Sequence, residues 1–276
     1  NVITPKISII SSISMDHQDF LGDSVEMIAF EKSGIIKNKI PLIIGHQPYP
    51  EAKEILIDQA EYKKAPVFAH GIHWNLIEYK NSLIYQDNQN EIKFNNLEKH
   101  NNFQKKNLGL AIATLSKLPL ININSFFSKG LHNKINFPGR MEKITKGPLV
   151  SILDPSNELY LDGSHNEDAA RNLNSSLNQL PQKKLCIILG MINTKDPISY
   201  LSQFTNIDAL TVITIPDEEN AISSSELRSK LNRYYKNINE ANSVKDALKS
   251  INRNYKNVRI LICGSLYLAG KVLSMN

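Results

Sequence analysis

The sequence predicts an α/β protein built on parallel sheets, and three observations lead to that prediction. Short apolar runs typical of buried strands alternate with amphipathic stretches of helical period along most of the 276 residues. Side chains that cap helices, such as Ser223 and Ser243, stand just before several of these stretches. No internal repeat or low-complexity segment interrupts the alternation. We therefore expect a mostly parallel, doubly wound sheet in the C-terminal half.

The N-terminal half begins with an apolar run over residues 7–13, which predicts a strand. A helix is expected from about Ser24 to Ser33, because Asp23 and Glu26 have the spacing of a capping box and Gly34 marks its end. The further elements expected in this half are a strand at 41–45, a helix opening at Pro50, a strand at 66–69, small antiparallel strands within 70–99 and a helix over 107–118.

A new composition begins near residue 137, after a connecting segment at 122–137. The strands expected beyond it cover 149–153, 159–162, 185–189, 210–215 and 258–263, and the helices cover 167–180, 197–204, 224–234, 244–254 and 267–275. The chain is long enough for two domains with separate cores, and we place them at 1–136 and 137–276.

Composition narrows the possible functions. Hydrophobic residues make up 41% of the chain and charged residues 21%, which is ordinary for a soluble protein, and no stretch approaches a membrane-spanning length. The net charge of +5 comes from lysines scattered along the chain, without a basic run with interleaved aromatics, so we expect no nucleic-acid partner. Cys186 and Cys263 each lie inside an apolar run and the N-terminus lacks signal-peptide features, which together indicate a reducing, cytoplasmic location.

Lys32 is the most informative single residue of the N-terminal half. It follows Val25, Ile28 and Ala29 at helical spacing, which places it on the apolar face of the expected helix. Burial would lower the pKa of its ammonium group and leave some neutral, nucleophilic amine. A snorkelling lysine is the ordinary alternative. Asp16 and His17 strengthen the functional interpretation, because they follow the first strand, at the sheet edge where ligands bind in α/β proteins.

These residues belong to a longer pattern that resembles a known family. The pattern comprises Asp16-His17, Leu21-Gly22, Ile28-Ala29, Glu31-Lys32-Ser33-Gly34-Ile35-Ile36-Lys37 and Pro41. It is similar to the signature of folylpolyglutamate synthases and dihydrofolate synthases, members of the Mur ligase superfamily. The resemblance implies a Mur-ligase-type central ATPase domain followed by a Rossmann-like, mostly parallel ligase domain. It also implies that Lys32 carries a carbamate and that, with His17, it binds a second Mg²⁺ ion.

Two further positions match nucleotide-binding residues of that family. Gln104 and Asn107 resemble a Gln-x-x-Asn motif whose asparagine hydrogen-bonds the adenine of ATP, although Leu108 departs from the small residue usual there. Arg140 lies in a Pro-Gly-Arg sequence whose arginine reaches nucleotide phosphate. Without the resemblance, Gln104 and Asn107 would be helix-capping groups and Arg140 an exposed turn residue.

The sequence 161–166 carries a second constellation, with Asp162 and His165 between an expected strand and helix. Backbone N–H groups and the helix dipole make such a turn suited to an anion. In the family, the matching Asp-Gly-Ala-His-Asn motif faces a cleft where nucleotide and glutamate meet; here Ser164 replaces the alanine. Taken alone, an Asp and a His at a helix start are more often capping and surface groups. Weaker matches continue at 193–196, 225–226 and 263–267.

The implied reaction is ATP-dependent amide ligation, in which L-glutamate is added to folate or dihydropteroate through an acyl phosphate. The resemblance assigns catalysis to Lys32, His17, Asp162 and His165, with ATP and Mg²⁺ as cofactors and a monomeric state. A ligase acting on a peptidoglycan precursor is disfavoured by the Asp-His and Glu-Lys-Ser-Gly sequences.

One expected feature is missing from the printed sequence. It begins with Asn1, and neither a G-x-x-x-x-G-K-[ST] phosphate loop nor a G-x-G-x-x-G motif occurs in it. We therefore expect an incomplete or inactive copy of the ligase, since the triphosphate would lack its binding loop. The alternative is a non-catalytic module that binds an anion or a partner. The choice between dihydropteroate and folate acceptors stays open.

Overall fold

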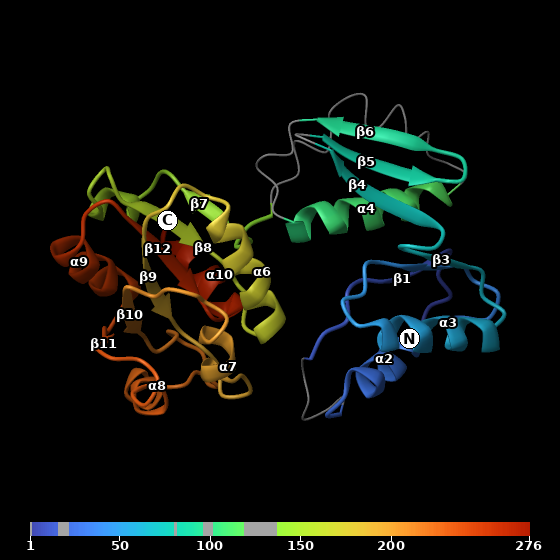
Figure 1. Cartoon of the computed structure of the whole chain (residues 1–276). Coiled ribbons are helices and arrows are strands. Elements are labelled where there is room, and N and C mark those ends of the chain that lie inside the picture. Colours follow the sequence, from blue (N-terminus) through green and yellow to red (C-terminus); the bar gives the residue numbers. More distant parts are fainter. Residues whose placement is uncertain (1, 16–21, 80–81, 96–101, 119–136) are drawn as a thin grey trace. The chain divides into compact units, whose positions relative to one another are not determined.

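The computed structural model describes residues 2–15, 22–79, 82–95, 102–118 and 137–276 (Figure 1). The chain divides into two compact units, residues 1–135 and 136–276, and each is described by itself. The expected boundary after residue 136 falls beside this division, and the activities assigned to the two domains stay predictions.

The first unit contains a short parallel sheet in the order β1 (Ser8–Ile10), β2 (Leu42–Ile44) and β3 (Val67–Ala69). Helices α2 (Val25–Ser33) and α3 (Pro50–Tyr62) cover one face of it (Figure 1), and their buried side chains pack on Ile10, Leu42 and Ile44. Proline at the first turn of α3 fits the helix start, because that N–H needs no intrahelical partner.

The other face of this sheet meets an antiparallel sheet and one helix. β4 (Trp74–Tyr79), β5 (Ser82–Asp87) and β6 (Glu91–Asn95) pair in sequence order, as the loose alternation over 70–99 predicts. Helix α4 (Asn102–Ser116) packs with them, and Ile43 from β2 joins Trp74 and Ile112 in one buried cluster. The first unit therefore has two small cores that share the strand β2.

The second unit is built on a six-stranded sheet in the order β11-β10-β9-β12-β8-β7. Its strands are β7 (Glu142–Ile144), β8 (Glu158–Leu161), β9 (Lys184–Leu189), β10 (Ala209–Val212), β11 (Ile238–Glu240) and β12 (Val258–Cys263). All neighbours are parallel except β7, which pairs with β8 in the antiparallel sense. The four central strands are nearly continuous apolar runs, as expected of strands buried on both faces.

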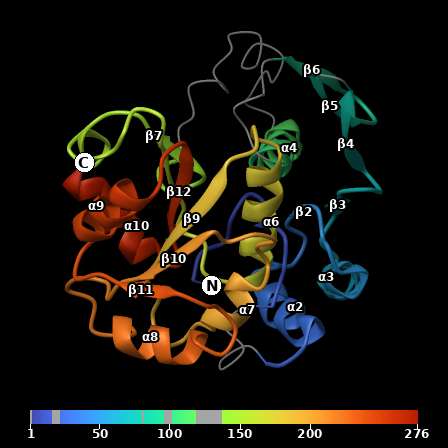
Figure 2. The same cartoon turned by 60° about the vertical axis from the view of Figure 1, so that its left-hand side comes forward.

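Helices cover both faces of this sheet (Figure 2), so the prediction of a doubly wound, mostly parallel fold is confirmed. One face carries α6 (Glu167–Asn178), α7 (Pro197–Leu201) and α8 (Ser224–Leu231), and the other carries α9 (Val244–Asn254) and α10 (Leu266–Met275). Ser223 and Ser243 cap α8 and α9 as the sequence predicts, each accepting from a backbone N–H three residues on.

Three elements of this unit differ from the sequence prediction. Residues 149–153 do not form a strand; Val150–Ile152 is a single 3₁₀ turn whose apolar side chains pack on the core from a loop. Strands β7 and β11 were not expected, since each has only three residues, too few to show a period of two.

Of the residues the structure describes, none belongs to a helix long and apolar enough to cross a membrane.

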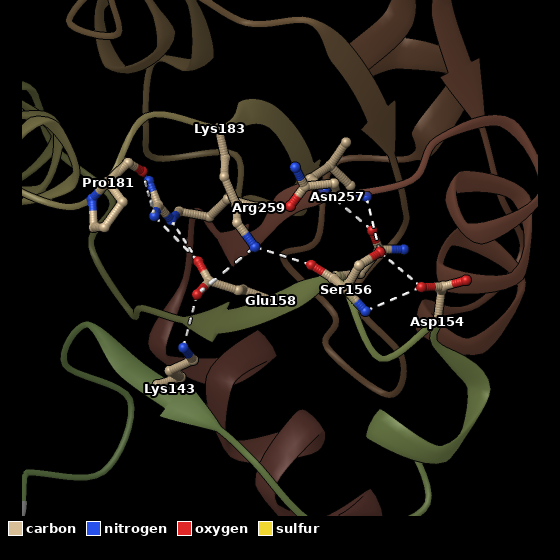
Figure 3. A network of polar contacts seen from close by, with 10 residues as sticks. Lys143, Asp154, Ser156, Glu158, Pro181, Lys183, Asn257 and Arg259 are labelled. Carbon is tan, nitrogen blue, oxygen red and sulfur yellow. Dashed lines mark hydrogen bonds and ion pairs between the residues drawn. The ribbon is translucent and has the colours of Figure 1, made fainter.

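The amino end of the six-stranded sheet carries a network of charges (Figure 3). Arg259 on β12 lies opposite Glu158 on β8, and its guanidinium donates to Glu158 Oε2 at 3.1 Å and to the Pro181 carbonyl at 3.0 Å. Lys143 on β7 donates to the other carboxylate oxygen of Glu158 at 2.8 Å, and the Lys183 ammonium lies 3.9 Å from it. The Arg259 side chain is only 5% exposed. This network ties together three adjacent strands at one end.

Candidate active site at the carboxyl end of the sheet

The Pro-Gly-Arg sequence forms a tight turn just before β7. The Arg140 amide donates to the Phe137 carbonyl at 3.2 Å, and the Gly139 amide donates to Glu142 Oε2 at 2.8 Å. Gly139 has a φ of +64°, a backbone conformation that glycine adopts without steric cost. The turn leaves the Arg140 side chain exposed, so a guanidinium is presented to solvent on a fixed backbone.

Asp162 holds this turn against the end of β8. Its carboxylate accepts from the Met141 amide at 2.7 Å through one oxygen and from the Ser164 amide at 2.7 Å through the other. The residue is only 7% exposed, and burial raises its pKa above the ordinary value. Arg140 opposes that shift through its positive charge. Asp162 therefore ties the backbone that follows Arg140 to the 162–166 turn.

Gly163 makes the contact between these two turns close. Its amide donates to the Gly139 carbonyl at 2.8 Å, which joins the turns directly through their backbones. A Cβ at Gly163 would lie 2.4 Å from Leu266 Cδ2, too close for any side chain without displacement. Glycine lets the backbone of 162–164 approach the start of α10, since a Cβ would also lie 3.3 Å from Leu266 Cα.

The Ser164 hydroxyl occupies a polar position inside the core. It lies 2.8 Å from the Tyr200 hydroxyl, and both side chains are buried. Burial raises the pKa of Tyr200 well above its ordinary value, so this phenol stays protonated and available as a donor. The serine that replaces the family's alanine at position 164 thus has a hydrogen-bond partner on α7, the Tyr200 hydroxyl. No local sequence pattern connects Ser164 with Tyr200, because the two residues are 36 positions apart.

Two helices begin at this edge of the sheet. Asn166 caps α6 by accepting from the Ala169 amide at 2.9 Å, and Ser265 caps α10 by accepting from the Tyr267 amide at 3.1 Å. His165 stands beside the first cap, with Nδ1 3.2 Å from the Gly163 carbonyl. Because β8 and β12 are neighbours, two positive helix ends lie next to each other beyond these strands. This arrangement favours an anion.

In the first unit, the two residues expected to bind adenine lie at a different position in the helix from the one predicted. Gln104 and Asn107 lie within α4, which begins at Asn102, and not at the entry of a helix over 107–118. Their spacing of three places them on neighbouring positions of the helix surface, so one ligand can contact both. Asn107 lies too far inside the helix to cap its start, and the contact of both residues with adenine stays a prediction.

The expected metal site is described only in part. Asp16 and His17 lie outside the described residues. Lys32 is exposed, so its expected place on the buried face of the helix is wrong. Ile28 and Ala29 pack in the core, but Lys32 stands in the last turn, where its long side chain reaches solvent. The helix cap is Ser24, which accepts from the Met27 amide at 3.2 Å, and not Asp23.

No group of three or more His, Cys, Asp or Glu residues in the described ranges is placed to hold a metal ion. Both cysteines are free and buried, as their apolar surroundings predict. The carbamate on Lys32 and the role of His17 at a metal therefore stay predictions.

Comparisons with known proteins find similar sequences and structures. The family model for the C-terminal domain of dihydrofolate synthetase matches residues 149–275, which include strands β8 to β12 and the 162–166 turn. A dihydrofolate synthase/folylpolyglutamate synthase of Haemophilus influenzae is 30% identical over 97% of this chain and 62% of its own length. Residues 149–275 therefore belong to the family of dihydrofolate synthetase C-terminal domains, and the whole chain is similar to folylpolyglutamate and dihydrofolate synthases. A folylpolyglutamate synthase of Lacticaseibacillus casei is 27% identical over 99% of the chain.

Solved structures of the same family share the fold. The Yersinia pestis bifunctional folylpolyglutamate synthase/dihydrofolate synthase, complexed with AMPPNP and Mn ion, matches with a TM-score of 0.79 at 23% identity over 98% of this chain. The Escherichia coli protein in complex with DHPP and ADP matches with a TM-score of 0.76. The chain spans 62% of the length of its H. influenzae and L. casei relatives and 61% of these two structures.

Proposed function

We propose that this family member takes part in ATP-dependent ligation of L-glutamate to a folate or dihydropteroate carboxylate. The observation that carries the proposal is the joined pair of turns at 137–141 and 162–166, in which Asp162 fixes the backbone that bears Arg140. Such a fixed, exposed guanidinium beside two helix ends matches the needs of phosphoryl transfer, where positioning and charge neutralisation supply most of the catalysis.

In the proposed reaction, a carboxylate oxygen of the acceptor attacks the γ-phosphorus of ATP and ADP leaves. The resulting acyl phosphate is attacked by the glutamate amine, which loses a proton as phosphate departs and the amide bond forms. Arg140 is the residue we assign to nucleotide phosphate, and Gln104 and Asn107 are assigned to adenine. His165, beside the cap of α6, is assigned to the reacting groups.

Asp162 takes a different role from the one the resemblance implies. Both of its carboxylate oxygens are engaged by backbone amides, and the residue is buried. We therefore propose it as a positioning residue that acts through the Arg140 turn.

Mg²⁺ would neutralise phosphate charge in this reaction. We assign it to His17 and to Lys32 in carbamylated form; the exposure of Lys32 leaves its amine accessible to dissolved carbon dioxide. The related structures carry AMPPNP with Mn, ADP and, in one case, L-glutamate. This supports a nucleotide and a divalent metal for the family, and the comparisons do not favour the alternative of a non-catalytic module.

The test is an assay of the purified protein with ATP, Mg²⁺, L-glutamate and either dihydropteroate or a folate. We expect ADP release together with a product heavier by one glutamate residue. Arg140→Met should lower kcat/KM for ATP by about 10- to 100-fold, the loss expected for one charge-assisted phosphate contact. Arg171→Gln is the matched control, because Arg171 is an exposed arginine of α6 that pairs with Glu167 and Asp168 and donates to Gln203 Oε1 at 3.3 Å.

Two outcomes would contradict the proposal. Absence of glutamate transfer to both acceptors would exclude ligation, and retained ADP binding in that case would indicate a binding module. An Arg140→Met protein with unchanged kcat/KM for ATP would remove Arg140 from the site.

A further inference from the structure

The carboxyl end of the small parallel sheet in the first unit carries a cluster of basic side chains. His46 and His70 follow β2 and β3 directly, after Gly45 and Ala69 respectively. Lys53 from α3 and Lys106 from α4 approach the same place, and we call these four residues the histidine–lysine cluster. Ligands of α/β sheets bind at this end of the strands, because loops and helix starts gather there.

The four side chains lie close to one another. The ring centroids of His46 and His70 are 5.4 Å apart, and Lys106 Nζ lies 3.4 Å from His46 Nε2. Lys53 Nζ reaches over Gly71, the residue after His70, at 3.7 Å from the position of an ideal Cβ there. The His70 amide donates to the Ile44 carbonyl at 3.0 Å, so the backbone of the cluster is tied to the sheet.

Gly45 and Trp74 fix the cluster from two sides. A Cβ at Gly45 would lie 3.1 Å from Leu110 Cδ2, so α4 packs directly on the backbone beside His46 and brings Lys106 with it. The His70 ring meets Trp74 edge-on with centroids 4.8 Å apart, and Trp74 in turn stacks on Tyr85 at 5.9 Å. Trp74 is buried, so the imidazole of His70 rests on a rigid part of the core.

The electrostatics of the cluster are one-sided. Burial lowers the pKa of His70 to about 4, helped by the charges of His46, Lys53 and Lys106. Burial, followed by Lys106 and Lys53, also lowers the pKa of His46. Partial burial lowers the pKa of Lys106, and Glu78 on β4 is the carboxylate that opposes this shift. Glu78 is already paired with Lys105, at 3.2 Å.

We propose that the histidine–lysine cluster binds an oxyanion, the phosphate or carboxylate group of a small molecule. Two ammonium groups and two imidazoles converge from four different elements, and each can donate a hydrogen bond to an oxyanion. A metal cation is disfavoured, because the two lysines repel it at close range. The proposal does not depend on the ligation reaction and concerns a site in the first unit alone.

Binding at such a site is coupled to proton uptake. An anion beside the imidazoles favours their charged form, so it raises the pKa of His70 from its depressed value. By linkage, the anion binds more tightly at pH 5 than at pH 8.5, because it binds best to the protein with His70 protonated and the pKa of His70 lies near 4. A cluster that serves only to pack the core would show no such coupling.

Trp74 supplies the measurement, since it is the single tryptophan of the chain and an imidazolium quenches indole fluorescence on contact. At pH 5 we expect added phosphate or glutarate to quench the fluorescence saturably, and we expect the midpoint of its pH titration to move upward by about one unit from its value near 4. Chloride at equal ionic strength should do neither, and at pH 8.5 the same anions should have little effect. Comparison of phosphate with glutarate identifies the preferred oxyanion.

Lys106→Met should abolish the anion-dependent shift, whereas Lys105→Met, one position earlier on the same helix and paired with Glu78, should retain it. His Cε1 proton resonances, assigned with His46→Asn and His70→Asn, give a second reading of the same shift. Circular dichroism checks that each variant is folded. A midpoint that moves no further with phosphate or glutarate than with chloride would overturn the proposal, as would an undiminished shift in Lys106→Met.

Discussion

The two ends of the six-stranded sheet satisfy their charges in opposite ways. At the amino end, Glu158 and Arg259 neutralise each other through their side chains, with Lys143 and Lys183 beside them (Figure 3). At the carboxyl end, the Asp162 carboxylate accepts from two main-chain amides, those of Met141 and Ser164, and has no lysine or arginine in a salt bridge among the described contacts. The difference shows two ways in which one sheet satisfies a carboxylate: at one end side-chain pairs neutralise its charge, and at the other backbone amides hold it and leave the neighbouring Arg140 exposed.

The largest effect is expected at the amino end. Glu158→Gln removes the carboxylate opposite the nearly buried Arg259 and should lower the free energy of unfolding by about 3 kcal/mol, because a buried charge loses its partner. Urea unfolding followed by circular dichroism measures it. Glu226→Gln is the matched control, since its i,i+4 pair with Lys230 is exposed and worth about 0.5 kcal/mol. Equal losses in both variants would refute the contrast between the buried and exposed pairs.

A smaller loss is expected at Asp162. In Asp162→Asn one oxygen still accepts from a backbone amide, but the NH₂ group faces the other amide and leaves a buried donor unsatisfied. We expect a cost of about 2 kcal/mol, together with a lower kcat/KM for ATP through displacement of Arg140. Asp208→Asn is the control, because exposed Asp208 accepts from the Leu185 amide and an asparagine oxygen can replace it there. Wild-type stability in Asp162→Asn would show that its amide contacts are dispensable.

The glycines of the carboxyl end sharpen the same comparison. Gly163→Ala forces a Cβ against Leu266 and should cost about 1–2 kcal/mol as the start of α10 moves. Gly270 lies inside α10, and no atom lies within 4 Å of its ideal Cβ position. Gly270→Ala should therefore stabilise the protein by about 0.5–1 kcal/mol. Thermal unfolding of the two variants therefore should shift in opposite directions; a shift of the same sign in both would contradict the close approach.

The carboxyl end of the small parallel sheet in the first unit extends the comparison. There the positive side chains of the histidine–lysine cluster have Glu78 as the carboxylate that opposes the lowered pKa of Lys106. The folded pKa of His70 is about 4, below the ordinary 6.5, so the unfolded chain binds more protons between these pH values. The contribution of neutral His70 to the free energy of unfolding is therefore fully present above pH 6.5 and is lost as the pH drops toward 4. His70→Asn should flatten this slope, measured by urea unfolding at intervals of pH. An unchanged slope would assign the acid sensitivity to other groups.

The sequence predicted the central architecture because long strands and capped helices leave strong local signals. The helix over 244–254 and the strand over 258–263 have the predicted bounds, since Ser243 and an uninterrupted apolar run define them. Short elements gave no such signal: β7 and β11 are fixed by pairing with longer strands, and residues 149–153 are apolar because they pack from a loop. A local sequence pattern therefore does not predict secondary structure where contacts with distant parts of the chain determine it.

Site residues followed the same rule. Motifs proposed Arg140, Asp162 and His165 as candidates, but no local pattern shows that Asp162 accepts from the amide of Met141, 21 positions earlier. Tyr200 and the histidine–lysine cluster were missed, because their members come from separate elements and no local spacing connects them. Lys32 was misplaced, since helical periodicity does not show where the last turn of a helix leaves the core.

The distribution of two rare residue types gives each unit its own reporter of unfolding. The single tryptophan lies in residues 1–135, whereas both cysteines lie in 136–276, on the adjacent strands β9 and β12. Burial raises the pKa of each thiol to about 12, so neither reacts with an alkylating reagent until its sheet opens. Tryptophan emission and thiol labelling, recorded on one sample, therefore time the opening of the two units separately and reveal whether they unfold as one cooperative body or in sequence.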